Sequence, residues 1–426
     1  MARPRQFARL TLLFACMACA PVGIQAQTLE LLIRDTLATH PSTQSQRALV
    51  KSAQAGVDTA QWQFYPTPSV TVERASASAT DPLYQGDAQV ATLRLQQPLH
   101  TGGRLTAGLD KARAGLVVSQ ATLDETRLQL GLRVVQAYGD WMSAHLKTLA
   151  NEKSLLTHTK LRDQVRRRLA EGVSAQSDLV LALGRLDAIT AEVTAGRTQR
   201  DMALTRLGQL LGKPVTDDSL VGTLAAPHAL AQGPQALLTQ ALEQSPAVQK
   251  AQAQARVAQA VVGERRADLS PELYARLDRQ YGNFNLPNGA PQTRLFIGLS
   301  TRFGAGLSAL SNVEAARIQH EAAVVDIEAQ SRAVSEQVLS DHALVVSSAS
   351  RLDSIRASLR SAEEVSSSYD RQFLAGRKSW LDVMNAAREL AQTETQIAEL
   401  LSTQMVVSWR LNFYTQGLSA VTSNTP

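Results

Sequence analysis

The sequence contains an internal repeat of one long unit, and this duplication constrains its fold more than any other feature. The stretch HPSTQSQRALVKSAQ around Pro41 matches SPAVQKAQAQARVAQ around Pro246 at an offset of 205 residues. Gly172 in RLAEGVSAQSDLV matches Gly376 in QFLAGRKSWLDVM at an offset of 204 residues. Because the register holds over nearly the whole of each half, two copies of one structural unit are the economical interpretation.

The duplication and the composition of the ends divide the chain into five segments. Residues 1–26 have a basic start, an apolar run and the ending IQA, which is the layout of a secretory signal peptide. The apolar run is too short to be a membrane-spanning helix. We expect the first copy over 27–213 and the second over 234–416, with an equatorial linker at 214–233 and a polar tail at 417–426. The signal peptide predicts that the protein is exported.

The chemistry available to the mature chain is limited. Both cysteines, Cys16 and Cys19, lie in the signal segment, so cleavage after Ala26 leaves no thiol or disulfide. LFAC loosely resembles a lipid-attachment box, which makes a lipoprotein the alternative, although Phe14 fits that box poorly. The seven histidines show no metal-ligand spacing, and no Gly-x-Ser-x-Gly element occurs, so we expect no catalytic residues, cofactor or metal. The formal net charge of +5 falls to +2 when the three arginines of the signal segment are removed, which gives no indication of nucleic-acid binding.

The placement of proline indicates where long helices lie. Pro98 is followed by no proline until Pro214, and Pro291 by none until Pro426. A proline inside a helix costs about 3 kcal/mol, so these windows permit very long helices. Leucine, valine and alanine recur there every three, four or seven residues, which is typical of a coiled-coil stripe. The predicted helical hairpins span 104–211, with a tip near 172, and 307–416, with a tip near 376.

The proline-rich zones, 66–98 and 271–291, have a different period. In QVATLRLQ, for example, Leu93 and Leu95 lie on one face and Arg94 on the other. Such alternation fits either a soluble sheet or an outer-membrane barrel with a wet lumen. The predicted strands span about 68–76, 88–98, 272–281 and 292–301. Four strands cannot close a barrel around a lumen and an open edge is not tolerated in lipid, so strands that span a membrane must come from several chains.

In this order and twice over, these features resemble the TolC family of outer-membrane channel proteins. The resemblance is carried by the strand-to-helix junction LQQPLHTGGR with Gly102 and Gly103, by DKARAGL and its echo VEAARI, and by the turns EGVSAQSDL and AGRKSWLDVM. It implies a mainly α fold with a membrane β-barrel portion, built from a duplicated helix–strand–strand–helix–helix unit. Three chains, each giving four strands and long coiled-coil hairpins, would form a twelve-stranded barrel and an α-helical tunnel.

The resemblance also implies location and partners. The homotrimer would lie in the lipid of the cell outer membrane, with its helical tunnel in the periplasm. The tips would dock a periplasmic adaptor (membrane fusion) protein and, through it, an inner-membrane transporter. The stretch AGRKSWLDVMNAAREL resembles tips of members that secrete proteins, including adhesins; multidrug or metal efflux is the alternative. A periplasmic coiled-coil scaffold or adaptor that never crosses a membrane is the alternative of another class.

Finally, the resemblance assigns roles to residues of the tips. The adaptor-docking positions are Gly172, Val173, Gly376 and Arg377. The candidates for a periplasmic gate are Ser177, Asp178, Phe373, Lys378 and Asp382.

Two positions depart from the pattern of the family. Phe373 stands where well-studied members have a tyrosine, and Asn385 stands where a second aspartate of an acidic ring is found. A ring of Asp382 carboxylates would still attract cations, although acids in a first helical turn also complement the helix dipole. We expect Trp380 to pack between the hairpins, with partner contact as the alternative. We expect RDQVRRR, 162–168, to be a solvated helix face, with contact to an acidic adaptor as the alternative.

Overall fold

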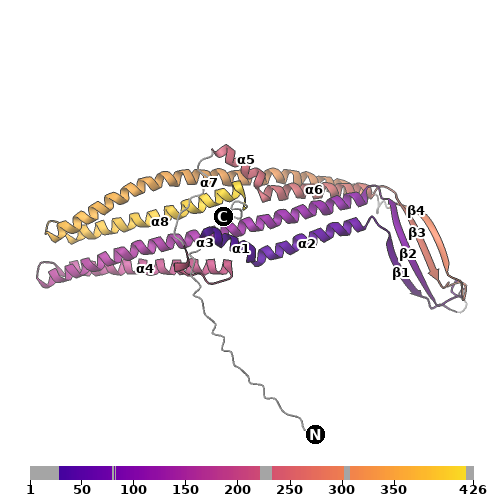
Figure 1. Ribbon diagram of the computed structural model, residues 1–426, viewed down its shortest axis with the longest axis horizontal. Coiled ribbons are helices and arrows are strands. Elements are labelled where there is room, and N and C mark those ends of the chain that lie inside the picture. Colours follow the sequence, from indigo (N-terminus) through magenta and orange to yellow (C-terminus); the bar gives the residue numbers. More distant parts are fainter. Residues whose placement is uncertain (1–27, 79–80, 82, 221–232, 302–307, 419–426) are drawn as a thin grey trace, which may run out of the picture.

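The protein is a long rod with its strands at one end and two helical tips at the other (Figure 1). The computed structural model describes residues 28–78, 81, 83–220, 233–301 and 308–418. The predicted signal segment, most of the predicted linker and most of the polar tail lie outside the described residues. Among the helices that are described, none is long and apolar enough to span a membrane.

The order of elements shows the duplication directly. The first copy consists of α1 (Leu29–Thr39), α2 (Pro41–Trp62), β1 (Thr67–Arg74), β2 (Gln89–His100), α3 (Arg104–Ala170) and α4 (Gln176–Leu211). A short 3₁₀ helix, η1 (Asp217–Ser219), follows. The second copy consists of α5 (Pro234–Gln244), α6 (Pro246–Ala267), β3 (Glu272–Tyr281), β4 (Gln292–Ser300), α7 (Ser308–Leu374) and α8 (Trp380–Gln416). The predicted fold class, mainly helical with four strands and two long hairpins, is confirmed.

The leading helix of each copy is divided in two. Pro41 begins α2 and Pro246 begins α6, because proline has no backbone N–H and its ring clashes with a preceding helical turn. The residue before each proline caps the new helix with its side chain. His40 Nδ1 accepts from the N–H of Ser42 at 3.2 Å, and Ser245 Oγ accepts from that of Val248 at 3.4 Å.

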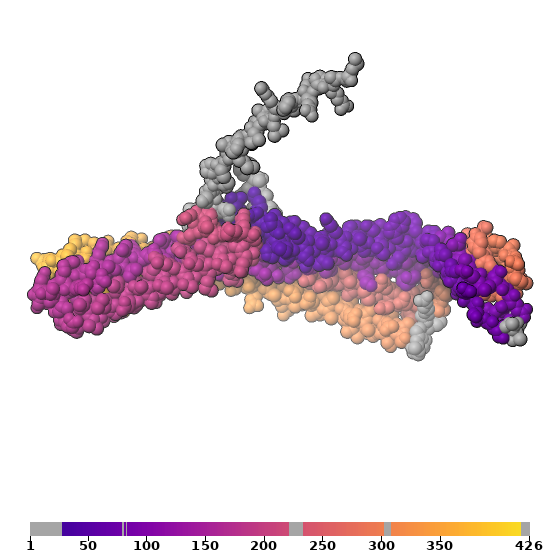
Figure 2. Space-filling model, turned by 90° about the horizontal axis from the view of Figure 1, so that it is seen from below, coloured from indigo at the N-terminus to yellow at the C-terminus, as the bar shows by residue number. Residues whose placement is uncertain are grey.

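Two uninterrupted helices organise the rod. α3 and α7 have 67 residues each, and are therefore on the order of 100 Å long. Near the sheet, the neighbours along the layer are α2, α3, α6 and α7; near the tips they are α4, α3, α8 and α7. Figure 2 shows α2 and α4 in line along one side of the rod. Four helices therefore lie side by side both near the sheet and near the tips.

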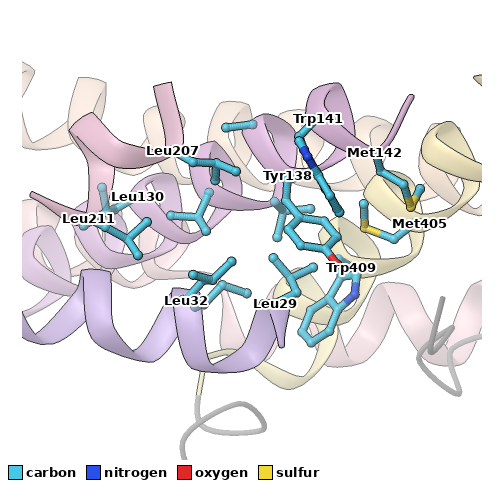
Figure 3. Close-up of a cluster of buried hydrophobic side chains, with 14 of the residues drawn as sticks. Leu29, Leu32, Leu130, Tyr138, Trp141, Met142, Leu207, Leu211, Met405 and Trp409 are labelled. Carbon is cyan, nitrogen blue, oxygen red and sulfur yellow. The ribbon is translucent and has the colours of Figure 1, made fainter. Parts of the chain in front are cut away.

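The main hydrophobic core lies where these two sets of helices meet. It draws its side chains from α1, α3, α4 and α8, among them Leu32, Tyr138, Trp141, Leu207 and Trp409 (Figure 3). Burial raises the pKa of the Tyr138 hydroxyl to about 12. The indole of Trp141 donates to Asp217 Oδ1 at 2.7 Å, which ties η1 to the core.

Candidate functional site

Both hairpin tips are built by the same turn. Gly172 and Gly376, at the predicted tips, have φ values of +72° and +71°, the left-handed conformation typical of a helix end. The N–H of Val173 donates to the carbonyl of Arg168, and that of Arg377 to Gln372, each at 2.8 Å. These bonds, reaching five residues back, are those of a Schellman motif. The side chains of Val173 and Arg377 are exposed beyond it, at the end of the rod.

The two aspartates that follow the turns cap the next helices. Asp178 Oδ2 accepts from the N–H of Ala175 at 3.2 Å. Asp382 Oδ2 accepts from the Ser379 hydroxyl at 2.9 Å and from its N–H at 3.3 Å. The hydrogen bond from the Ser379 hydroxyl lowers the pKa of Asp382, and the charge of Lys378, with its Nζ 3.9 Å from Oδ2, lowers it further. Asp382 is therefore ionised at neutral pH.

The hairpins are held together near their tips by a cluster of buried side chains, which we call the interhairpin cluster. Its members come from α3, α4, α7 and α8: Leu161, Val165, Ala182, Phe373, Trp380, Val383 and Met384. The prediction that Trp380 packs between the hairpins is confirmed, since only 9% of it is exposed.

Phe373 is also buried in this cluster, with the guanidinium of Arg168 5.2 Å from the centre of its ring. Within 162–168, Arg166 and Arg167 are exposed, as expected of a solvated face, whereas Arg168 is half-buried against Phe373 and Val165 is buried in the cluster. A basic run gives no sign in the sequence that one of its members stacks on a ring more than 200 residues away. Phenylalanine has no hydroxyl to donate a hydrogen bond, so Phe373 holds the tip by packing and by its contact with the Arg168 guanidinium.

The five predicted gate residues are not gathered at one site within the chain. Lys378 and Asp382 lie together on the second hairpin, where Lys378 Nζ is also 4.3 Å from the centre of the Tyr369 ring. Ser177 is exposed on the first hairpin. In the part of the chain that the structure describes, no hydrogen bond or ion pair joins Ser177 or Asp178 to the second hairpin. A gate formed by all five candidates would need contacts between chains.

The junction between β2 and α3 is fastened to the second copy. Gly102 and Gly103 both have positive φ, and a Cβ on Gly102 would lie 2.3 Å from Cβ of Ser270. Arg104 Nη2 donates to Glu272 Oε1 at 3.1 Å. TGGR is therefore a turn between strand and helix, as predicted, and a larger residue at Gly102 would push the two copies apart.

The four strands form one antiparallel sheet in the order β1-β2-β3-β4, and one face of this sheet is mostly apolar. Residues directly opposite each other in the register share a face. One face carries Val70, Val72, Leu93, Leu95, Leu277, Leu295, Ile297 and Leu299. All of these are exposed, with Val70 at 68% and Ile297 at 73%. Such a contiguous apolar surface marks a face that meets lipid or protein.

The opposite face of the sheet is polar and charged. Ser69, Arg94, Asp278 and Arg294 lie in one row across β1, β2, β3 and β4. Arg94 makes a two-pronged contact with Asp278, from Nε at 2.9 Å and from Nη2 at 3.2 Å. The sequence places these residues on polar faces, but the row arises only because β2 pairs with β3 across the two copies.

Comparisons with known proteins agree with this geometry. A family model described as "outer membrane efflux protein" matches residues 32–213 and 237–412. Among curated proteins, the chain is 24% identical over 340 residues to the alkaline protease secretion protein AprF of Pseudomonas aeruginosa. This alignment covers 77% of this chain and 69% of AprF. The chain is 27% identical over 166 residues to the protein CyaE of Bordetella pertussis, which covers 38% of this chain and 35% of CyaE. The match therefore spans about a third of CyaE.

Solved structures match over nearly the whole chain. CusC superposes with a TM-score of 0.77 at 18% identity, covering 91% of both chains. The outer membrane channel CmeC of Campylobacter jejuni gives 0.78 at 14% identity, covering 92% of this chain and 85% of that one. VceC of Vibrio cholerae gives a TM-score of 0.74 at 20% identity, and the match covers 91% of this chain and 96% of VceC. At these identities the likeness shows a shared fold.

Proposed function

Because this chain belongs to the outer membrane efflux protein family, we propose that it forms the outer-membrane exit duct of a tripartite export system. Three copies would make one twelve-stranded barrel in the outer membrane and one helical tunnel in the periplasm. The duct would carry no cofactor and catalyse no reaction. Its cargo would move through the tunnel once a periplasmic adaptor and an inner-membrane transporter are engaged.

The observation that carries this proposal is the two-faced sheet. Its apolar face is exposed across all four strands, while its other face carries three arginines and an aspartate. A spanning barrel needs this alternation, with apolar side chains toward lipid and polar ones toward a wet lumen. β1 and β4 are open edges in the single chain, and pairing β4 of one copy with β1 of the next would remove them.

The proposal gives the two ends of the rod different roles. The tips, with Gly172, Val173, Gly376 and Arg377, would meet the adaptor. The Asp382 carboxylates of three chains would form an acidic ring at the periplasmic mouth, and the contact of each with Lys378 would help to hold the mouth narrow. Phe373 would support this mouth from inside the interhairpin cluster.

The experiment that tests the duct is single-channel recording of the purified protein in planar bilayers. We expect discrete events of low conductance that become several-fold larger in Asp382→Ala, because the substitution removes the carboxylate that accepts from Ser379 at the start of α8 and that contacts Lys378. The pKa of Asp382 is lowered, so the ring should keep its charge at neutral pH and lose it only as the pH falls below the ordinary range of an aspartate.

Asp370→Ala is the matched control, because Asp370 is an exposed acid near the same tip and lies outside the turn. Equal conductance in the wild type and in Asp382→Ala would keep the duct and reject the gate. If correctly folded trimers gave no pores, the scaffold or adaptor alternative would replace the duct.

For the cargo, we propose secretion of a protein, as in type I secretion systems. The support is the tip stretch AGRKSWLDVMNAAREL and the similarity to AprF, whose name describes secretion of a protease. A deletion strain should lose an exported protein, such as an adhesin, from its surface or medium, and a plasmid copy should restore it. Unchanged secretion with hypersensitivity to drugs or metals would favour the efflux alternative.

A further inference from the structure

The polar face of the sheet carries more positive charge than its structure requires. Three arginines and one aspartate lie at mid-height: Arg94, Arg276, Asp278 and Arg294, which we call the arginine belt. Asp278 accepts hydrogen bonds from Nε and Nη2 of Arg94. Its Oδ2 also lies 3.2 Å from Nε of Arg276, without the geometry of a hydrogen bond. A single carboxylate therefore serves two guanidinium groups.

The third arginine of the belt is paired with no acid. Arg294 lies directly opposite Asp278 in the register of β3 and β4, but its Nη2 donates to Gln292 on its own strand. Within the described residues, Arg294 forms no ion pair. Arg276 lies over the Phe296 ring, with its guanidinium carbon 4.4 Å from the ring centre. The belt thus has a formal net charge of +2 in each chain.

Other acids on this face lie away from the belt. Glu272 stands at the helical end of β3 and is paired with Arg104. Glu73 stands four residues beyond Ser69 along β1, on the order of 13 Å from the row of Arg94. Arg279, by contrast, is opposite Leu93 and belongs to the apolar face. The surplus is therefore concentrated in one belt and is not spread over the sheet.

We propose that the arginine belt is an anion-binding filter in the lumen of the barrel, which engages carboxylate groups of a polypeptide cargo as it passes. This inference rests on the proposed duct, in which three copies of the belt form a ring of net charge +6. Guanidinium groups match carboxylates through paired N–H donors, and charges that line a narrow wet channel raise the local concentration of the opposite ion. The filter has the opposite sign to the Asp382 ring, so cargo meets an acidic mouth and then a basic barrel.

The test compares channels that differ only in the belt. The reference channel carries Asp382→Ala, so that the acidic mouth does not mask the barrel. Arg276→Gln combined with Arg294→Gln brings the belt to zero charge and leaves the Arg94–Asp278 pair intact. We expect the chloride-to-potassium permeability ratio, taken from reversal potentials in a KCl gradient near 0.1 M, to fall by about threefold or more. At 1 M KCl, where the Debye length is about 3 Å, the difference should disappear.

A second readout addresses the cargo. An oligo-glutamate peptide of about 20 residues should block the reference channel at a lower concentration than oligo-lysine. In the double variant the blocking concentration of oligo-glutamate should rise about tenfold, because six exposed guanidinium–carboxylate contacts are lost in the trimer.

Arg279→Gln is the control matched to Arg276→Gln, since it removes one arginine charge from the same strand, β3, on the opposite face. Its permeability ratio should equal that of the reference channel. An equal fall in the control, or no fall in the double variant, would overturn the filter while leaving the duct intact. Absence of pores in the reference channel would instead overturn the duct itself. If the double variant failed to form trimers, Arg294→Gln alone, at an exposed and unpaired arginine, should give a smaller fall in the same direction, and an unchanged ratio would reject the proposal.

Discussion

Replacing Arg410 by alanine should lower the thermal unfolding midpoint of the helical region by on the order of 10 °C. Arg410 in α8 binds both carboxylate oxygens of Asp341 in α7, with Nε 2.7 Å from Oδ2. Asp341 is completely buried and also accepts from Gln337 at 2.9 Å. Removing the arginine leaves a buried carboxylate without a countercharge, which costs about 3–5 kcal/mol. Circular dichroism at 222 nm on detergent-solubilised protein measures the midpoint, at about 2–4 °C for each kcal/mol.

The duplication supplies a matched control for this prediction. Arg206 occupies the position equivalent to Arg410, 204 residues earlier. Its Nη1 lies 3.5 Å from Oδ2 of Asp140, and the side chain of Asp140 is half-exposed. Exposed ion pairs contribute about 0–1 kcal/mol, so Arg206→Ala should change the midpoint by only a few degrees. Equal effects of the two substitutions would mean that burial of Asp341 is not what makes its pair important.

Replacing Trp380 by alanine should loosen the tips without unfolding the rod. Trp380 fills the interhairpin cluster, and truncating a buried tryptophan costs about 3–5 kcal/mol. That cost falls on the contact between the two hairpins, so amide hydrogen exchange in 161–182 and 373–391 should become on the order of a hundredfold faster. Exchange in the sheet and in the core around Trp141 should remain at the wild-type rate. Mass spectrometry of peptic fragments gives both measurements.

Leu374→Ala serves as the comparison, because Leu374 lies beside Phe373 at the same tip but is 69% exposed. Its exchange rates should stay within about twofold of the wild type, as expected for a surface substitution. If Trp380→Ala left tip protection unchanged, the hairpins would be held by contacts outside this cluster. If it accelerated exchange in the sheet as well, the cluster would stabilise the whole chain and not the tips alone.

Much of the fold could be predicted because its signals are local or periodic. The absence of proline between Pro98 and Pro214 and the recurrence of apolar residues are sufficient for a long hairpin. A glycine between two such helical stretches indicates the turn, and Gly172 and Gly376 both have the positive φ of a helix end. The division of the leading helix at Pro41 follows from the same chemistry of proline.

The arrangement of the tips and the belt depends on contacts between distant segments. Phe373 could be aligned with a gate position, yet its burial against Arg168 depends on how two hairpins pack. Alternation along β2 and β3 places Arg94 and Asp278 on polar faces. Their meeting requires a register between strands 184 residues apart, and a slip of one residue would move every side chain to the other face.

That same pairing of β2 with β3 sets an order for folding. Each long hairpin closes through a turn of a few residues, so it can form as soon as its own stretch of chain is available. The centre of the sheet must instead bring together strands from the two halves, and closing so large a loop costs conformational entropy before any contact repays it. The helices should consequently form first and the sheet last, when both halves of the chain are available. In the proposed duct, the apolar face would then be assembled only at the stage when three chains and a bilayer can cover it, which would limit the time during which it can aggregate.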